Sequence, residues 1–63
     1  MNKKVYEAYL KLDPQKVGIG NSTDAAYTFG YNGGKQVGIY RYPKDSICYG
    51  AYCAGRDRKR SEK

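Results

Sequence analysis

The side chains best suited to chemistry are the cations at the C-terminal end, in the run Arg56-Asp57-Arg58-Lys59-Arg60. Residues 56–63 hold five basic and two acidic side chains, a net +3, which is half of the net charge of +6 of the whole chain. Arginine presents a planar fork that matches phosphate oxygens, and clustered cations gain affinity by releasing counterions from nucleic acid. We expect the four cations of this run to bind nucleic acid or another anionic partner. The alternative is a solvated end that keeps the chain soluble.

A second group combines cations with aromatic rings, because Lys35, Arg41 and Lys44 flank Tyr40 and Tyr42. Bases stack on any exposed ring, so cations interleaved with rings suit single-stranded nucleic acid. The chain has eight tyrosines and one phenylalanine, so its tyrosines must also build the core. For each of these rings, a place in the core is therefore the alternative to a binding role.

Catalytic and metal-binding side chains are sparse. The chain has no histidine, which removes the usual general base and the commonest zinc ligand. Its six carboxylates are scattered singly, and its two cysteines cannot close a four-ligand zinc site. Residues 17–21 hold two glycines but lack the third glycine of a dinucleotide-binding loop. We expect no enzyme, no metal, no cofactor and no small-molecule substrate.

The length of 63 residues allows one small domain, for which we expect residues 1–55, followed by a basic C-terminal end at 56–63. The pattern predicts an α+β fold in which a short antiparallel sheet is covered by two short helices. The strands are expected near residues 4–12 and 36–42, and the helices near 22–35 and 46–60. A fold made mostly of β-hairpins is the alternative.

Residues 4–12 fit two periodicities. Alternation from position 6 onward predicts a strand, whereas Val5, Ala8 and Tyr9 have the spacing of a helical stripe. The aromatic and β-branched content, and the stop at Pro14, favour the strand.

Residues 21–35 fit either a hairpin that turns near Gly33 or a helix that begins at Asn21, a residue type that caps helices well. In the C-terminal segment, Cys48 and Cys53 distinguish a hairpin from a helix. In a hairpin the two thiols would face each other and could form a disulfide, whereas in a helix they would stay apart and reduced. We expect helices in both segments.

Small residues at helical spacing predict how the two helices pack. Ala26, Gly30 and Gly34 recur every four residues, and Ala51 and Gly55 repeat that spacing near the end of the chain. Glycine costs a helix roughly 1 kcal/mol relative to alanine, so it is tolerable only where another backbone packs closely against it. We expect the two helices to cross at short range along these five residues.

The pattern of small residues, glycines and tyrosine over residues 25–56 resembles the ribosome modulation factor family. The matching residues are Ala26, Gly30, Tyr31, Gly33, Pro43, Tyr52 and Gly55. The resemblance implies two short helices in a basic protein that binds the RNA of the small ribosomal subunit. The sequence departs from the family at Tyr52, where the family prefers tryptophan, and in its shorter segment between the helices.

The charge and the resemblance together predict a small, non-catalytic protein that binds structured RNA, with ribosomal RNA as the first candidate, or another nucleic acid. The alternative is a phage- or plasmid-type inhibitor that occupies an acidic surface or a nucleic-acid-binding groove of a host protein. The sequence has no apolar run long enough for a signal peptide or a membrane span, so we expect a cytoplasmic protein without a membrane partner.

Overall fold

The computed structural model describes residues 1–35 and 41–62, and this part of the chain forms three α-helices. They are α1 (Lys3–Leu10), α2 (Ser22–Tyr31) and α3 (Ile47–Ser61). The expected α+β fold with an antiparallel sheet is wrong, because the described residues include no strand and the fold is all-α. Most of the strand expected at 36–42 lies outside the described residues, and Arg41 and Tyr42 are not in a strand.

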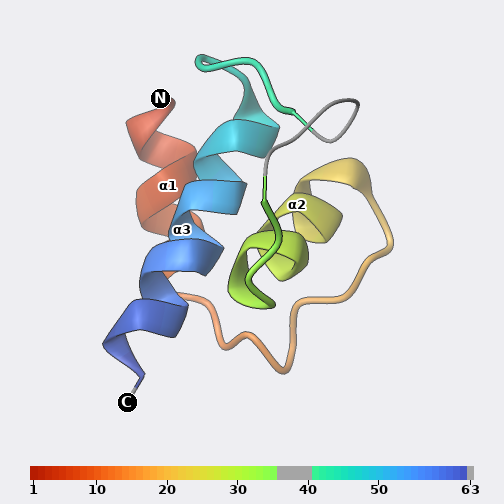
Figure 1. Cartoon of the computed structure of the whole chain (residues 1–63), viewed down its shortest axis with the longest axis vertical. Coiled ribbons are helices and arrows are strands. Elements are labelled where there is room, and N and C mark those ends of the chain that lie inside the picture. The colour runs from red at the N-terminus through yellow and green to blue at the C-terminus, as the bar shows by residue number, and fades with distance from the viewer. Residues whose placement is uncertain (36–40, 63) are drawn as a thin grey trace.

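Helix α3 is the centre of the fold, with α1 along one side of it and α2 across the other (Figure 1). It has 15 residues, begins at a Ser46 cap whose hydroxyl accepts from the Tyr49 N–H at 3.1 Å, and carries three cations in its last turn. Cations at this end are favourable because the helix dipole is negative there. The basic run at 56–60 is therefore part of a helix, as the interval predicted near 46–60 implies.

Helix α1 replaces the strand predicted near residues 4–12. The Asn2 side chain caps it by accepting from the Val5 N–H at 3.2 Å, and Val5 and Tyr9 pack against the core from one helical face. Glycine at position 50 of α3 allows this approach, since a Cβ there would lie 3.0 Å from the Asn2 carbonyl oxygen. Packing of the helical stripe against α3 thus overrides the local β propensity.

Helix α2 begins where the sequence predicts and ends earlier than the predicted position 35. The Asn21 side chain accepts from the Asp24 N–H at 2.8 Å. After Tyr31 the chain turns through Gly33, whose φ is +84°, and the Gly34 N–H donates to the Phe29 carbonyl at 2.8 Å. This is the Schellman arrangement that ends many helices, and it requires a left-handed residue that glycine supplies without strain.

Helices α2 and α3 cross at glycine. A Cβ on Gly30 would overlap the backbone carbonyl of Tyr52, and a Cβ on Gly55 would overlap that of Tyr27. Ala26 and Ala51 are fully buried in the same contact. Gly34 lies beyond the end of α2, so the ridge predicted to run through it stops at Gly30, and Gly34 instead leaves room for the Phe29 ring.

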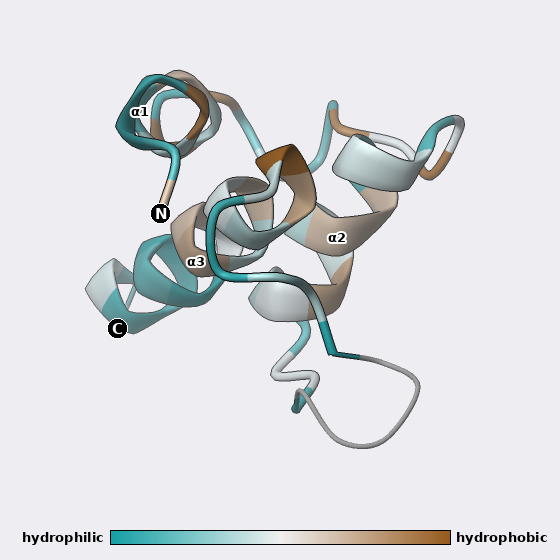
Figure 2. Cartoon of the chain, turned by 90° about the horizontal axis from the view of Figure 1, so that it is seen from above, coloured by the Kyte–Doolittle hydropathy of each residue, from teal (hydrophilic) through white to brown (hydrophobic). Residues whose placement is uncertain are grey.

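The core is small and aromatic. Ala26, Tyr27, Ala51, Tyr52 and Ala54 are buried, and six of the described tyrosines lie against another ring. Figure 2 shows the apolar parts of α2 and α3 turned toward each other, whereas the last turns of α3 are hydrophilic. Both cysteines are on α3 and are free thiols.

Candidate nucleic-acid interface

Tyrosine hydroxyls join the helices by donating to carboxylates. Tyr6 of α1 donates to Asp57 of α3 at 2.5 Å, and Tyr9 of α1 donates to Asp24 of α2 at 2.5 Å. Tyr31 of α2 donates to Glu62, the residue that caps the end of α3. Each pair of helices is therefore joined by one tyrosine–carboxylate hydrogen bond. In each bond the carboxylate has a donor within the chain.

These contacts set the ionisation of the carboxylates at the end of α3. Burial alone would raise the pKa of Asp57, but hydrogen bonds from Tyr6 and Arg56 and the charge of Arg56 outweigh it, so the pKa is lowered. The hydrogen bond from Tyr31, helped by the Arg58 guanidinium, lowers the pKa of Glu62. Both carboxylates are therefore ionised at neutral pH and held by partners inside the molecule.

Most of the carboxylates have a hydrogen-bond or ion-pair partner within the chain. Asp24, Asp57 and Glu62 accept from tyrosines, Asp13 accepts from the Gln15 N–H at 3.0 Å, and Asp45 lies 3.5 Å from the N-terminal ammonium. Five of the six carboxylates of the chain thus have partners in the fold. A polyanion therefore approaches exposed cations, while most of the carboxylates, several of them also exposed, already have a partner in the chain.

Two of the four cations predicted at the C-terminal end support the fold. Arg58 donates from Nη1 to the Leu10 carbonyl at 3.0 Å, satisfying the end of α1, and from Nε to Glu62 at 3.4 Å. Arg56 donates from Nε to Asp57 at 3.2 Å, and both arginines are only partly exposed. These contacts position the two guanidinium groups. Only their remaining N–H donors can bind a ligand.

The other two cations point outward. Lys59 and Arg60 are exposed, and the Lys59 ammonium lies 5.1 Å from the centroid of the Tyr31 ring. Exposed Lys11 directly follows Leu10, which Arg58 holds beside the last turns of α3. We call Lys11, Lys59 and Arg60 the C-end cluster. The sequence offers no sign that Lys11 belongs to it, because the contact joins residues 48 positions apart.

A second group of exposed cations lies at the other end of α3. The N-terminal ammonium contacts Asp45, and the Asn2 carbonyl lies beside Gly50, so the start of α1 sits next to the segment that leads into α3 (Figure 1). The exposed cations on these two segments are Lys3, Lys4, Arg41 and Lys44, and the Asp45 side chain, 98% exposed, lies on the same segment as Arg41 and Lys44. We call these four cations the N-end cluster. Arg41 and Lys44 are predicted site residues, whereas the contribution of Lys3 and Lys4 is visible only in the fold.

The aromatic part of the predicted site is mostly internal. The Tyr42 ring packs at 5.7 Å from Tyr52 and 6.4 Å from Phe29, measured between ring centroids. Tyr40 lies outside the described residues. Lys35 is exposed and follows Gly34, whose carbonyl accepts from the Tyr52 hydroxyl at 2.7 Å, so it lies near the middle of α3 and belongs to neither cluster.

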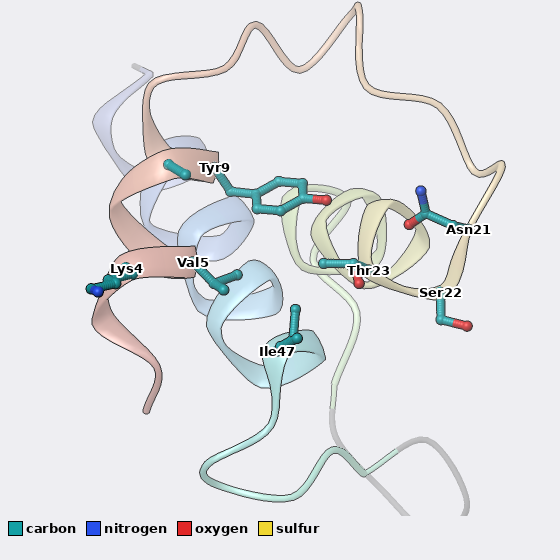
Figure 3. A pocket seen from close by; sticks show the side chains of 8 residues that line it. Lys4, Val5, Tyr9, Asn21, Ser22, Thr23 and Ile47 are labelled. Carbon is teal, nitrogen blue, oxygen red and sulfur yellow. The ribbon is translucent and has the colours of Figure 1, made fainter.

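An open groove of about 640 Å³ lies between α1 and the start of α2. Val5 and Ile47 point into it, Thr23 lines its other wall, and the Tyr9 ring lies across one end (Figure 3). Its lining is mainly apolar, with Ile47 53% exposed. The groove could receive an apolar side chain, and it adjoins the N-end cluster through Lys4.

Comparison with protein-family models, with curated proteins and with solved structures finds no match to this chain. The resemblance to the ribosome modulation factor family therefore stays a hypothesis. Among residues 1–35 and 41–62, no group of three or more histidine, cysteine, aspartate or glutamate side chains is placed to hold a metal ion. No helix in this part of the chain is long and apolar enough to cross a membrane.

Proposed function

We propose that this protein binds structured RNA through the exposed cations at the two ends of α3. The observation that carries the proposal is the division of charge: Asp24, Asp57 and Glu62 accept hydrogen bonds from tyrosines, while the cations of the C-end and N-end clusters are exposed. Exposed positive charge attracts phosphate and releases counterions on binding. The resemblance to a ribosome-binding family makes ribosomal RNA the first RNA to test.

Lys59 and Arg60 provide the sharpest test, because they are exposed, whereas Arg56 and Arg58 are partly buried and hydrogen-bonded to Asp57, Glu62 and the Leu10 carbonyl. A Lys59→Gln/Arg60→Gln variant should bind a folded ribosomal RNA fragment at least about tenfold more weakly at low salt, measured by fluorescence anisotropy. The charge-preserving swap Lys59→Arg/Arg60→Lys should restore most of the affinity. Circular dichroism should show the same helix content in all three proteins.

Equal RNA affinity in the parent and the glutamine variant would contradict the proposal. So would recovery of one stoichiometric protein, and no RNA, when the tagged chain is used to capture partners from lysate with and without nuclease. That second outcome would support the alternative of an inhibitor that binds a host protein.

A further inference from the structure

The rings that could stack on unpaired bases are placed between the helices. Tyr9, Tyr27 and Tyr31 form one row, with centroids 5.3 and 6.5 Å apart. Phe29, Tyr42, Tyr49 and Tyr52 form a second group on the other side of the crossing. Proteins that hold single strands present exposed rings to successive bases. Among the described rings, two are buried and most of the others pack against the core, with Tyr31 partly exposed, which favours recognition of the sugar–phosphate backbone over stacking on bases.

The helices that carry most of the cations of the two clusters are held together by close contacts. Helix α3 has 15 residues and so is about 22 Å long, at 1.5 Å per residue, and the two clusters lie at its two ends. Backbone contact at Gly30 and Gly55, the Tyr6–Asp57 hydrogen bond and the Arg58–Leu10 hydrogen bond fasten the other helices to it. The helices that carry Lys3, Lys4, Lys59 and Arg60 are therefore packed against one another, which limits how far the spacing of the two clusters can change; Arg41 and Lys44 lie on the loop before α3.

A two-point surface whose spacing can change only little favours a rigid ligand. A flexible single strand must be ordered before it can touch both clusters, and that ordering costs conformational entropy. A double helix already holds its phosphates in place, so once one cluster binds, the other meets phosphate at high effective concentration. Double-stranded RNA is also recognised mainly by its backbone and shape, because side chains cannot read its deep, narrow groove.

We infer that the bound RNA is a double-helical stem, contacted along its backbone by the N-end and C-end clusters at once. This inference rests on the proposed function and adds the kind of RNA structure and the way it is held.

The test compares RNA hairpins that share one loop and differ in stem length, together with an unpaired oligonucleotide as long as the longest hairpin. Affinity should rise by about tenfold or more when the stem becomes as long as α3, about 22 Å, and then level off. The slope of log K against log salt should steepen at the same length, because more phosphates are neutralised. The unpaired oligonucleotide should bind about as weakly as the shortest stem.

Variants at each end show whether both clusters act together. Arg41→Gln/Lys44→Gln and Lys59→Gln/Arg60→Gln should each weaken binding to the long stem by about tenfold or more, and to the shortest stem by only about twofold. Equal losses on the two stems, or an unpaired oligonucleotide bound as tightly as the long stem, would overturn the inference and leave RNA binding intact. No salt-dependent binding to any of these RNAs would overturn the proposed function and the inference with it.

Discussion

At the scale of single residues, tyrosine hydroxyls supply partners for three of the carboxylates. Tyr6, Tyr9 and Tyr31 each donate to a carboxylate on another helix or at its cap. A phenylalanine at any of these positions would pack equally well but would leave a carboxylate with fewer donors. The tyrosine content of the chain thus serves the packing of the core and the positive surface together.

The Tyr6–Asp57 bond predicts how stability responds to acid. The pKa of Asp57 is lowered in the folded protein, so its contribution is present above its ordinary pKa of about 4 and is lost as pH falls through the folded value. Tyr6→Phe should reduce the free energy of unfolding by about 1 kcal/mol at pH 7. The gap from the parent should close as pH falls below about 4, in urea unfolding measured at several pH values.

Tyr52→Phe is the matched control, because the Tyr52 hydroxyl donates to the Gly34 carbonyl, which does not titrate. Its loss of stability should stay constant over the same acid range. If Tyr6→Phe and Tyr52→Phe respond alike to acid, Asp57 does not draw its low pKa from Tyr6.

Tyr9 predicts the response to alkali. Burial and the hydrogen bond to Asp24 raise its pKa to about 12. The neutral hydroxyl is favoured in the folded state, so this contribution is complete below pH 10 and is lost as pH rises from about 10 to about 12. Tyr9→Phe should cost about 1 kcal/mol at pH 7, and the difference from the parent should shrink over that interval. Parallel stability curves for parent and variant would contradict the assignment.

Some residue roles follow from the sequence and others do not. The caps at Asn21 and Ser46 can be predicted because capping is local: the side chain bonds an N–H three residues on. The division of the basic run into anchored Arg56 and Arg58 and outward Lys59 and Arg60 cannot be predicted. It depends on partners such as the Leu10 carbonyl, which tertiary folding brings to Arg58 from 48 positions away.

At the scale of helices, the close crossing of α2 and α3 makes glycine indispensable at two positions. Gly30→Ala and Gly55→Ala each place a methyl group onto a backbone carbonyl, so each should destabilise the protein by about 3 kcal/mol. Gly20→Ala is the control, since nothing lies within 4 Å of a Cβ there, and it should change stability by less than about 1 kcal/mol. Thermal unfolding of the three variants checks this. A Gly30→Ala protein that melts higher than the parent would rule out the close crossing.

The segment at residues 4–12 is predicted as a strand but forms helix α1, although its sequence pattern fits both. The residues from Tyr6 onward alternate as in a strand, yet Val5 and Tyr9 also fit a helical face, and local pattern cannot choose between the two. The choice is made by α3, where Gly50 leaves space for the start of α1. The predicted end of α2 is late for a simpler reason: Gly33 ends the helix, although Gly34 continues the four-residue spacing.

At the scale of the whole molecule, the longest dimension is 28 Å, and α3 spans most of it. Its two ends carry exposed cations supplied by four separate segments of the chain: the start of α1, Lys11 just after its end, the segment before α3, and the last turns of α3. Net charge is a property of the sequence, but its gathering at two ends arises from the fold. The salt dependence of RNA binding therefore reports on the arrangement proposed here.

RNA binding by the two clusters is tested most sharply by the slope of log K against log salt, determined on a folded ribosomal RNA fragment for the parent and for Lys59→Gln/Arg60→Gln. Each phosphate neutralised contributes about 0.9 to the slope on a duplex. We expect a steep, linear decrease in affinity with salt for the parent, and a slope smaller by about 1.8 for the variant, which removes two contacts. RNA binding by the parent that is insensitive to salt would contradict the proposed function. A variant with the parent's slope would contradict it as well.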